Sequence, residues 1–125
     1  MLKDRRMHST IPVSDLERAR TWYADKLGLE PVEESPGGLF YECAGGTKFL
    51  LFPSPSAGTA KNTAAGWAVP DIEAEVAELR GRGVVFDEYD TPALKTVGGI
   101  ATTGPVRAAW FKDSEGNTLG VVQLP

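Results

Sequence analysis

Hydrophobic residues recur with helical periodicity in two segments of the chain. In the first segment, intervals of three or four residues place four side chains on one helix face, namely Leu16, Ala19, Tyr23 and Leu27. Ser14 and Glu17 have the spacing of a capping box, in which side chains bind free amide groups of the first turn. Gly28 follows as a stop, because glycine readily adopts the left-handed conformation after a helix.

The second helical segment begins at Asp71 and is followed by a glycine stop at Gly83. Glu73 and Glu75 lie in its first turn, where the helix dipole favours negative charge. Its apolar face is predicted to carry Ile72, Val76 and Leu79. The pattern therefore predicts two helices of similar design in the two halves of the chain.

Short apolar runs bounded by turn residues predict four strands around each helix. Around the first helix we expect strands at about 7–13, 29–34, 39–44 and 47–53. Around the second we expect strands at about 64–69, 84–89, 105–112 and 118–124. The last two strands are joined by DSEGN, in which Gly116 suits a turn position with positive φ.

Residues 90–104, DTPALKTVGGIATTG, form a longer connection than two neighbouring strands need, and they are rich in Gly and Thr. Loops of this length are often binding loops or lids. A passive excursion along the surface explains the segment equally well. Both interpretations stay open.

The two halves of the chain repeat one motif. Four positions match at an offset of 56 residues, namely Val13 with Val69, Asp15 with Asp71, Leu16 with Ile72 and Glu17 with Glu73. Two similar modules fused head to tail are the simplest explanation. We therefore predict a single α+β domain over residues 1–125, made of two tandem β-α-β-β-β modules. Module one covers about 7–53, a linker about 54–63 and module two about 64–124.

Composition supports one globular domain, since 42% of the 125 residues are hydrophobic and 24% are charged. No run approaches the roughly 18 apolar residues of a membrane span, and MLKDRRM at the N-terminus has no apolar stretch behind its charges. The single cysteine, Cys43, cannot form an internal disulfide, which fits a reducing compartment. We therefore expect a cytoplasmic protein with no membrane partner.

A net charge of −4 argues against nucleic acid as a partner.

The chain resembles the vicinal oxygen chelate superfamily in three features: its paired modules, the V-x-D-[LI]-E sequence at both helices and the C-terminal WFKDSEGNTLGVVQ. This group includes glyoxalase I, bleomycin-resistance proteins, extradiol dioxygenases and fosfomycin-resistance enzymes. The resemblance implies that each module is a curved mixed sheet with one helix on its convex face. It also implies that paired modules enclose a cleft, that the protein is a homodimer and that its partner is a small organic ligand.

Metal-dependent members of this superfamily bind a divalent ion through residues at four positions. The resemblance places these positions at His8, Leu50 (or Phe52 if the register shifts by two), Ala64 and Gly120. Only His8 has a metal-binding side chain, and a divalent ion needs about three or four such ligands. We therefore expect no metal and no other cofactor. The alternative is a metal held by displaced ligands such as Glu42 or Cys43.

Alternate residues of the opening strands are expected to face the cleft, since neighbouring side chains of a strand point to opposite sides. The predicted ligand-binding residues are His8, Thr10, Phe40, Glu42, Leu50, Phe52, Ala64, Gly66, Trp110 and Gly120. Small and apolar side chains predominate, which suits an organic ligand better than an ion. For Phe40, Leu50 and Phe52, burial in the core is an equal alternative. Trp67 has the opposite parity to Ala64 and is predicted to point toward the helix.

Two functions remain open at this point. The first is a binding protein that holds a small organic molecule in an apolar cleft without a metal. The second is an enzyme of the lyase, isomerase or dioxygenase-like type, with His8 as general base or with a metal on displaced ligands. His8 is the one catalytic candidate. The competing interpretation of His8 is a former ligand position at the mouth of the cleft, with no catalytic role.

Overall fold

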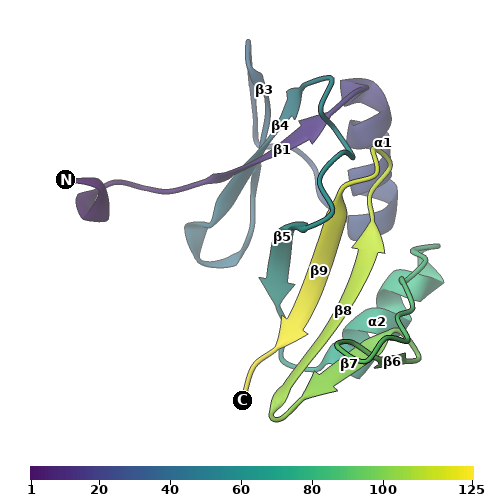
Figure 1. The fold of residues 1–125 in the computed structure, drawn as a ribbon. Coiled ribbons are helices and arrows are strands. Elements are labelled where there is room, and N and C mark those ends of the chain that lie inside the picture. Colours follow the sequence, from purple (N-terminus) through teal and green to yellow (C-terminus); the bar gives the residue numbers. More distant parts are fainter.

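The computed structural model describes residues 1–125 as two curved sheets, each with one helix packed on a single face (Figure 1). The first sheet has the strand order β1-β4-β3-β2. The first module consists of β1 (Ser9–Val13), α1 (Leu16–Leu27), β2 (Glu33–Ser35), β3 (Gly38–Glu42) and β4 (Lys48–Pro53).

The second sheet has the order β5-β9-β8-β7-β6. The second module consists of β5 (Thr63–Ala68), α2 (Ile72–Gly81), β6 (Thr96–Val97), β7 (Ile100–Thr103), β8 (Val106–Lys112) and β9 (Thr118–Gln123).

Both sheets are mixed, and strands β5, β9, β8 and β7 repeat the order of the first sheet, with β6 as an additional edge strand. The opening strand of each module pairs in parallel with the closing strand, β1 with β4 and β5 with β9. All other strand pairs are antiparallel. The opening strands β1 and β5 also contact each other, so the two modules meet along these edges. The predicted α+β fold of two tandem modules is confirmed.

The two helices begin in the same way, as the internal repeat predicts. Asp15 and Asp71 are the N-caps, and each side chain accepts a hydrogen bond from the backbone amide three residues later, at 3.0 and 3.1 Å. The predicted capping box of Ser14 and Glu17 is wrong. Ser14 lies one residue before the cap, and its hydroxyl contacts the carboxylate of Glu115 in the other module at 2.9 Å.

Two of the predicted strands differ from the structure. The strand expected at 29–34 is reduced to the short β2, which starts at Glu33. The strand expected at 84–89 contains only a bridge between Phe86 and Phe111 of β8. Residues 84–89 therefore run beside the end of β8 without forming a regular strand.

The segment 90–104 contains sheet rather than an irregular connection. β6 and β7 form a hairpin joined by Gly98 and Gly99, whose φ angles are 58° and 80°. Positive φ at both central residues is what a tight type I′ turn requires. β7 then pairs with β8, so this segment supplies the strand that 84–89 was expected to form.

A hydrophobic core of 16 buried residues extends through both modules, between the sheets and the helices. Burial alternates along the strands, as expected for sheets with one covered face. In β1, Ile11 and Val13 are fully buried on the side of α1, while Pro12 between them and Thr10 before them are not. Neither helix is both long and apolar enough to cross a membrane.

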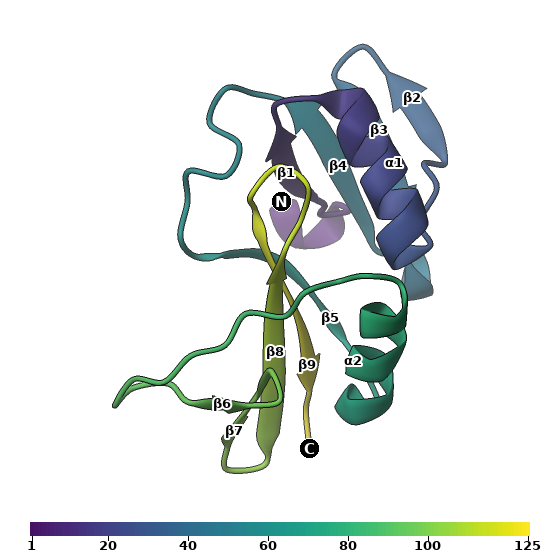
Figure 2. The same ribbon diagram turned by 90° about the vertical axis from the view of Figure 1, so that its right-hand side faces the viewer.

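The turn between β8 and β9 connects the second module to the first (Figure 2). Asn117 donates a hydrogen bond from Nδ2 to the carbonyl oxygen of Pro12 at 2.7 Å. The hydroxyl of Tyr23 in α1 donates to Oδ2 of Asp113 at 2.7 Å. Glu115 accepts from the backbone amides of Ser14 and Asp15 at 3.0 and 2.8 Å. DSEGN is thus a contact between modules as well as a turn.

Candidate functional site

The predicted cleft residues of the first module lie on the sheet face that points away from α1. Strand register places Thr10, Leu50 and Phe40 in one row across β1, β4 and β3. Pro12 and Phe52 stand opposite each other in the next row. Phe40, Leu50 and Phe52 are half-buried, whereas the residues that alternate with them are buried on the helix side. We call this surface and its counterpart in the second module the open faces.

His8 precedes β1 at the edge of the first open face and is exposed. Its imidazole meets the ring of Phe40 edge to face, with the ring centroids 5.4 Å apart. Glu42, also exposed, stands opposite Lys48 on the neighbouring strand. The edge of this face therefore combines an imidazole, a carboxylate and an ammonium group beside apolar rows.

The open face of the second module carries very little side-chain volume next to one large ring. Gly66, Gly120 and Trp110 form one row across β5, β9 and β8. The ring of Trp110 meets Tyr89 edge to face, with centroids 5.8 Å apart. Ala64 is half-buried and lies at an irregularity in β5, where the pairing with β9 shifts register. The row thus presents an indole ring beside backbone that carries no side chains.

The family's divalent ion does not fit the residues present. Histidine, cysteine and carboxylate side chains form no group of three or more that could hold a metal. The position of the fourth family ligand is Gly120, and a Cβ atom built there would lie 3.2 Å from Cδ1 of Trp110. A side chain at this position would therefore require the indole to shift by a few tenths of an ångström. That the protein binds no divalent metal remains a prediction.

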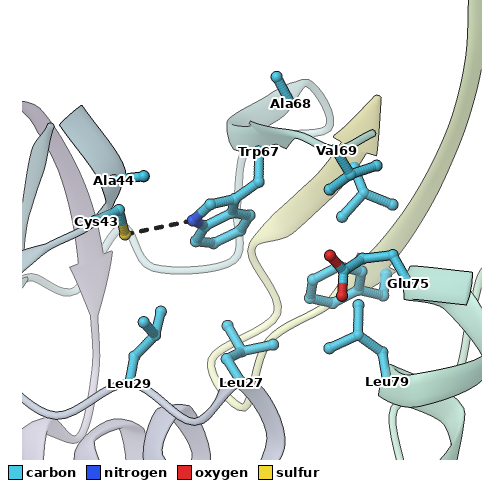
Figure 3. A pocket seen from close by; sticks show the side chains of 11 residues that line it. Leu27, Leu29, Cys43, Ala44, Trp67, Ala68, Val69, Glu75 and Leu79 are labelled. Atoms are coloured by element: carbon cyan, nitrogen blue, oxygen red, sulfur yellow. Dashed lines mark hydrogen bonds between the residues drawn. The ribbon is translucent and has the colours of Figure 1, made fainter. Parts of the chain in front are cut away.

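A cavity of about 320 Å³ lies between the modules on the helix side (Figure 3). We call it the inter-helix cavity. Leu27 and Leu29 line it from the end of α1, Leu79 from α2 and Trp67 from β5. Glu75 of α2 is the one charged residue among the eleven that line it. Trp67 points to this side of the sheet, as its parity predicts.

A second cavity, of about 390 Å³, adjoins the first near the start of β5. Both are lined by Cys43, Ala44, Trp67 and Ala68, so Trp67 lies between them. The indole Nε1 donates a hydrogen bond to Sγ of Cys43 at 3.4 Å. Gly66 is the one predicted ligand-binding residue that lines this second cavity.

Sequence reasoning missed the inter-helix cavity and the contacts of DSEGN. The sequence places Leu27 and Leu79 on the apolar faces of their helices. No pattern in a single sequence shows that these faces leave a cavity between the two helices. Asp113 and Glu115 were identified only as turn residues. A weak signal existed for them, since two carboxylates in a five-residue turn need partners when they are buried.

Residues 5–121 match the sequence profile of the Glyoxalase/Bleomycin resistance protein/Dioxygenase superfamily. The chain belongs to this superfamily. The match spans both modules and includes His8, Trp110 and Gly120. No curated protein matches the chain.

Several solved structures share the fold. TnmS3, an antibiotic binding protein from Streptomyces sp. CB03234, has a TM-score of 0.66 and 23% identity, covering 97% of this chain and 98% of its own. A glyoxalase/bleomycin resistance protein from Catenulispora acidiphila DSM 44928 has a TM-score of 0.70 and 21% identity, covering 96% and 98%. The oxidase ChaP-H2 has a TM-score of 0.65 and 22% identity, covering 97% and 94%. A binding protein and an oxidase thus share one fold, so function must be argued from the site.

Proposed function

We propose that this protein binds a small organic molecule on its open faces and uses no divalent metal. The observation that carries the proposal is the row of Gly66, Gly120 and Trp110. Gly66 is exposed, and the indole of Trp110 lies beside the buried Gly120. Bare backbone at Gly66 next to an indole ring offers a planar apolar group a surface to stack on. TnmS3, which is described as an antibiotic binding protein, supports a binding role for this fold.

The first open face supplies the polar groups of the proposed binding site. Thr10 offers a hydroxyl and His8 an imidazole, both beside the apolar side chains of Phe40 and Leu50. A few polar groups among apolar ones are typical of sites that orient an organic ligand. His8 then acts as a hydrogen-bonding group rather than as a general base.

We also propose that the protein is a cytoplasmic homodimer. Phe40, Leu50, Phe52 and Trp110 stay half-buried in the single chain, where no helix covers them. A second copy that placed its sheets opposite would cover these side chains and close a cleft around the ligand. The single cysteine, which leaves the chain without an internal disulfide, supports the cytoplasmic location.

Binding of the planar dye 8-anilinonaphthalene-1-sulfonate, followed by its fluorescence, tests the proposal. We expect the dye to bind in the presence of EDTA. Trp110→Ala should weaken binding by about tenfold or more, because the stacking surface is lost. Trp22→Phe is the matched control, since Trp22 packs against Tyr23 and Phe111 on the helix side and should leave binding unchanged. Loss of binding in EDTA, or equal binding by the Trp110 variant, would contradict the proposal.

A further inference from the structure

The inter-helix cavity is separate from the open faces. Phe111 of β8 and Val121 of β9 line it, and both are buried on the helix side of the second sheet. Their strand neighbours Trp110 and Gly120 point to the opposite side, because side chains alternate along a strand. A molecule in this cavity therefore does not contact the surface proposed above for the organic ligand.

The cavity has the size and lining of a small-molecule site. Its volume of about 320 Å³ exceeds the roughly 150 Å³ of an apolar cavity that accepts benzene. Leucine side chains from both helices form two walls, and the indole of Trp67 forms a third (Figure 3). The hydrogen bond from Trp67 to Cys43 fixes the orientation of that aromatic wall.

Glu75 introduces a single charge into this apolar setting. Figure 3 shows its carboxylate pointing from α2 toward the space between Trp67 and Leu79. The residue is half-buried, and its side chain forms no hydrogen bond or ion pair within the chain. Glu73, on the same turn of the helix, differs in that it pairs with Nη2 of Arg107 at 2.8 Å. A carboxylate beside an apolar cavity favours a ligand that brings a positive charge.

We propose that the inter-helix cavity binds a small aromatic amine in its protonated form. The ring system lies among the leucines and against the indole of Trp67, and the ammonium group pairs with Glu75. Charge complementarity selects this class of ligand, because a neutral molecule leaves the negative charge of the carboxylate uncompensated and an anion is repelled by it.

Calorimetric titration with tryptamine, and with its neutral counterpart tryptophol, tests the proposal. We expect tryptamine to bind and tryptophol to bind at least about tenfold more weakly. Glu75→Gln should weaken tryptamine binding by about tenfold and leave tryptophol binding unchanged, since it removes the charge and keeps the shape. Glu78→Gln is the matched control, because Glu78 is an exposed residue of the same helix that does not line the cavity.

Alkylation of Cys43 by iodoacetamide, compared between the unchanged protein and Glu75→Gln, locates the bound amine. Cys43 is the only cysteine and lines both cavities, whereas Glu75 lines the inter-helix cavity alone. We expect tryptamine to slow the alkylation of Cys43 in the unchanged protein and in Glu78→Gln. At the same tryptamine concentration, the alkylation rate of Glu75→Gln should change little. Leu79→Phe, which narrows the cavity without altering its charge, should weaken the binding of both tryptamine and tryptophol. The proposal is overturned if tryptamine does not bind, if tryptophol binds as tightly, if Glu75→Gln has no effect, or if bound tryptamine leaves Cys43 equally reactive.

Discussion

Nε of Arg18 in α1 lies 2.9 Å from Oε2 of Glu115 in the turn between β8 and β9. The glutamate side chain is fully buried, whereas the arginine is about half exposed. Two backbone amides and the hydroxyls of Ser14 and Ser114 also contact the same carboxylate. These contacts bring residues from the two modules into one charged hydrogen-bond cluster. We infer that Glu115 couples the stability of one module to that of the other.

Replacing Glu115 by Gln is expected to lower the free energy of unfolding by about 2 kcal/mol at neutral pH, because a buried charged acceptor is lost while its donors remain. Urea denaturation gives this value. Glu34→Gln is the control, since Glu34 pairs with Arg20 on the exposed surface and should change stability very little. Equal effects of the two substitutions would contradict the assigned role of Glu115.

The same cluster predicts a dependence of stability on acid pH. The hydrogen bond from Arg18, helped by those from Ser114, Asp15 and Ser14, lowers the pKa of Glu115 from 4.5 to about 2, although burial acts in the opposite direction. Because the pKa is lower in the folded protein, Glu115 stabilises the fold fully above about pH 4.5 and progressively less as the pH falls toward about 2. The stability difference between the unchanged protein and Glu115→Gln should therefore shrink over that range. A constant difference across the range would argue against this explanation.

Two buried tyrosines should respond in opposite ways to loss of their hydroxyl groups. Tyr23→Phe removes a buried hydrogen bond to Asp113, so we expect a loss of about 1–2 kcal/mol in the free energy of unfolding. The hydroxyl of Tyr41 is buried without a hydrogen-bond partner, and burial raises its pKa to about 12. Tyr41→Phe should therefore leave stability unchanged or raise it by about 1 kcal/mol. Thermal or urea unfolding of both variants checks the sign of each change.

Gly58 and Gly45 allow a matched test of the contact between the linker and DSEGN. Their φ angles are 72° and 70°, so Ala introduces the same backbone strain at both positions. A Cβ atom at Gly58 would lie 2.4 Å from the carbonyl oxygen of Glu115, whereas one at Gly45 has no neighbour within 4 Å. We expect Gly45→Ala to cost about 1 kcal/mol and Gly58→Ala to cost at least about 1 kcal/mol more. Similar losses in urea unfolding would show that the close approach is not required.

His8→Ala distinguishes binding from catalysis. If His8 only contacts the ligand, the variant should weaken ligand affinity by no more than about fivefold, which corresponds to one hydrogen bond. A general base predicts lost turnover with retained affinity. Equilibrium titration, together with a search for chemical change in the ligand, separates the two. Conversion of the ligand by the unchanged protein and not by the variant would favour the enzyme.

The sequence was sufficient for features that depend on local chemistry. Asp71 identifies the start of the second helix, whereas the capping-box pattern places the first start at Ser14, one residue before the true N-cap Asp15. The alternation in β1 and β4 identifies the face that points away from α1. The hairpin at Gly98 and Gly99 was also within reach, because two glycines between short strand-forming runs favour a tight turn. The length and the Gly and Thr content of residues 90–104 favour a loop, however, and the apolar run at 84–89 favours a strand there instead.

Features that depend on contacts between distant residues were beyond the sequence. Ser14 and Glu115 are 101 residues apart, and no pattern near Ser14 indicates that its hydroxyl serves the other module rather than its own helix. The inter-helix cavity has the same origin, because it depends on how α1 and α2 are spaced. Trp110 and Gly120 are each expected at the cleft from the sequence, but no sequence pattern shows that they stand opposite each other on β8 and β9 in close contact.

Native mass spectrometry of protein purified without chelators or added metal tests the central claim most directly, because one spectrum reports subunit number, metal content and any retained organic molecule. The proposed function predicts a dimer free of divalent metal that gains mass when an organic ligand is retained. A dimer with near-stoichiometric divalent metal would contradict it, and Glu42 and Cys43 would then be the first residues to substitute.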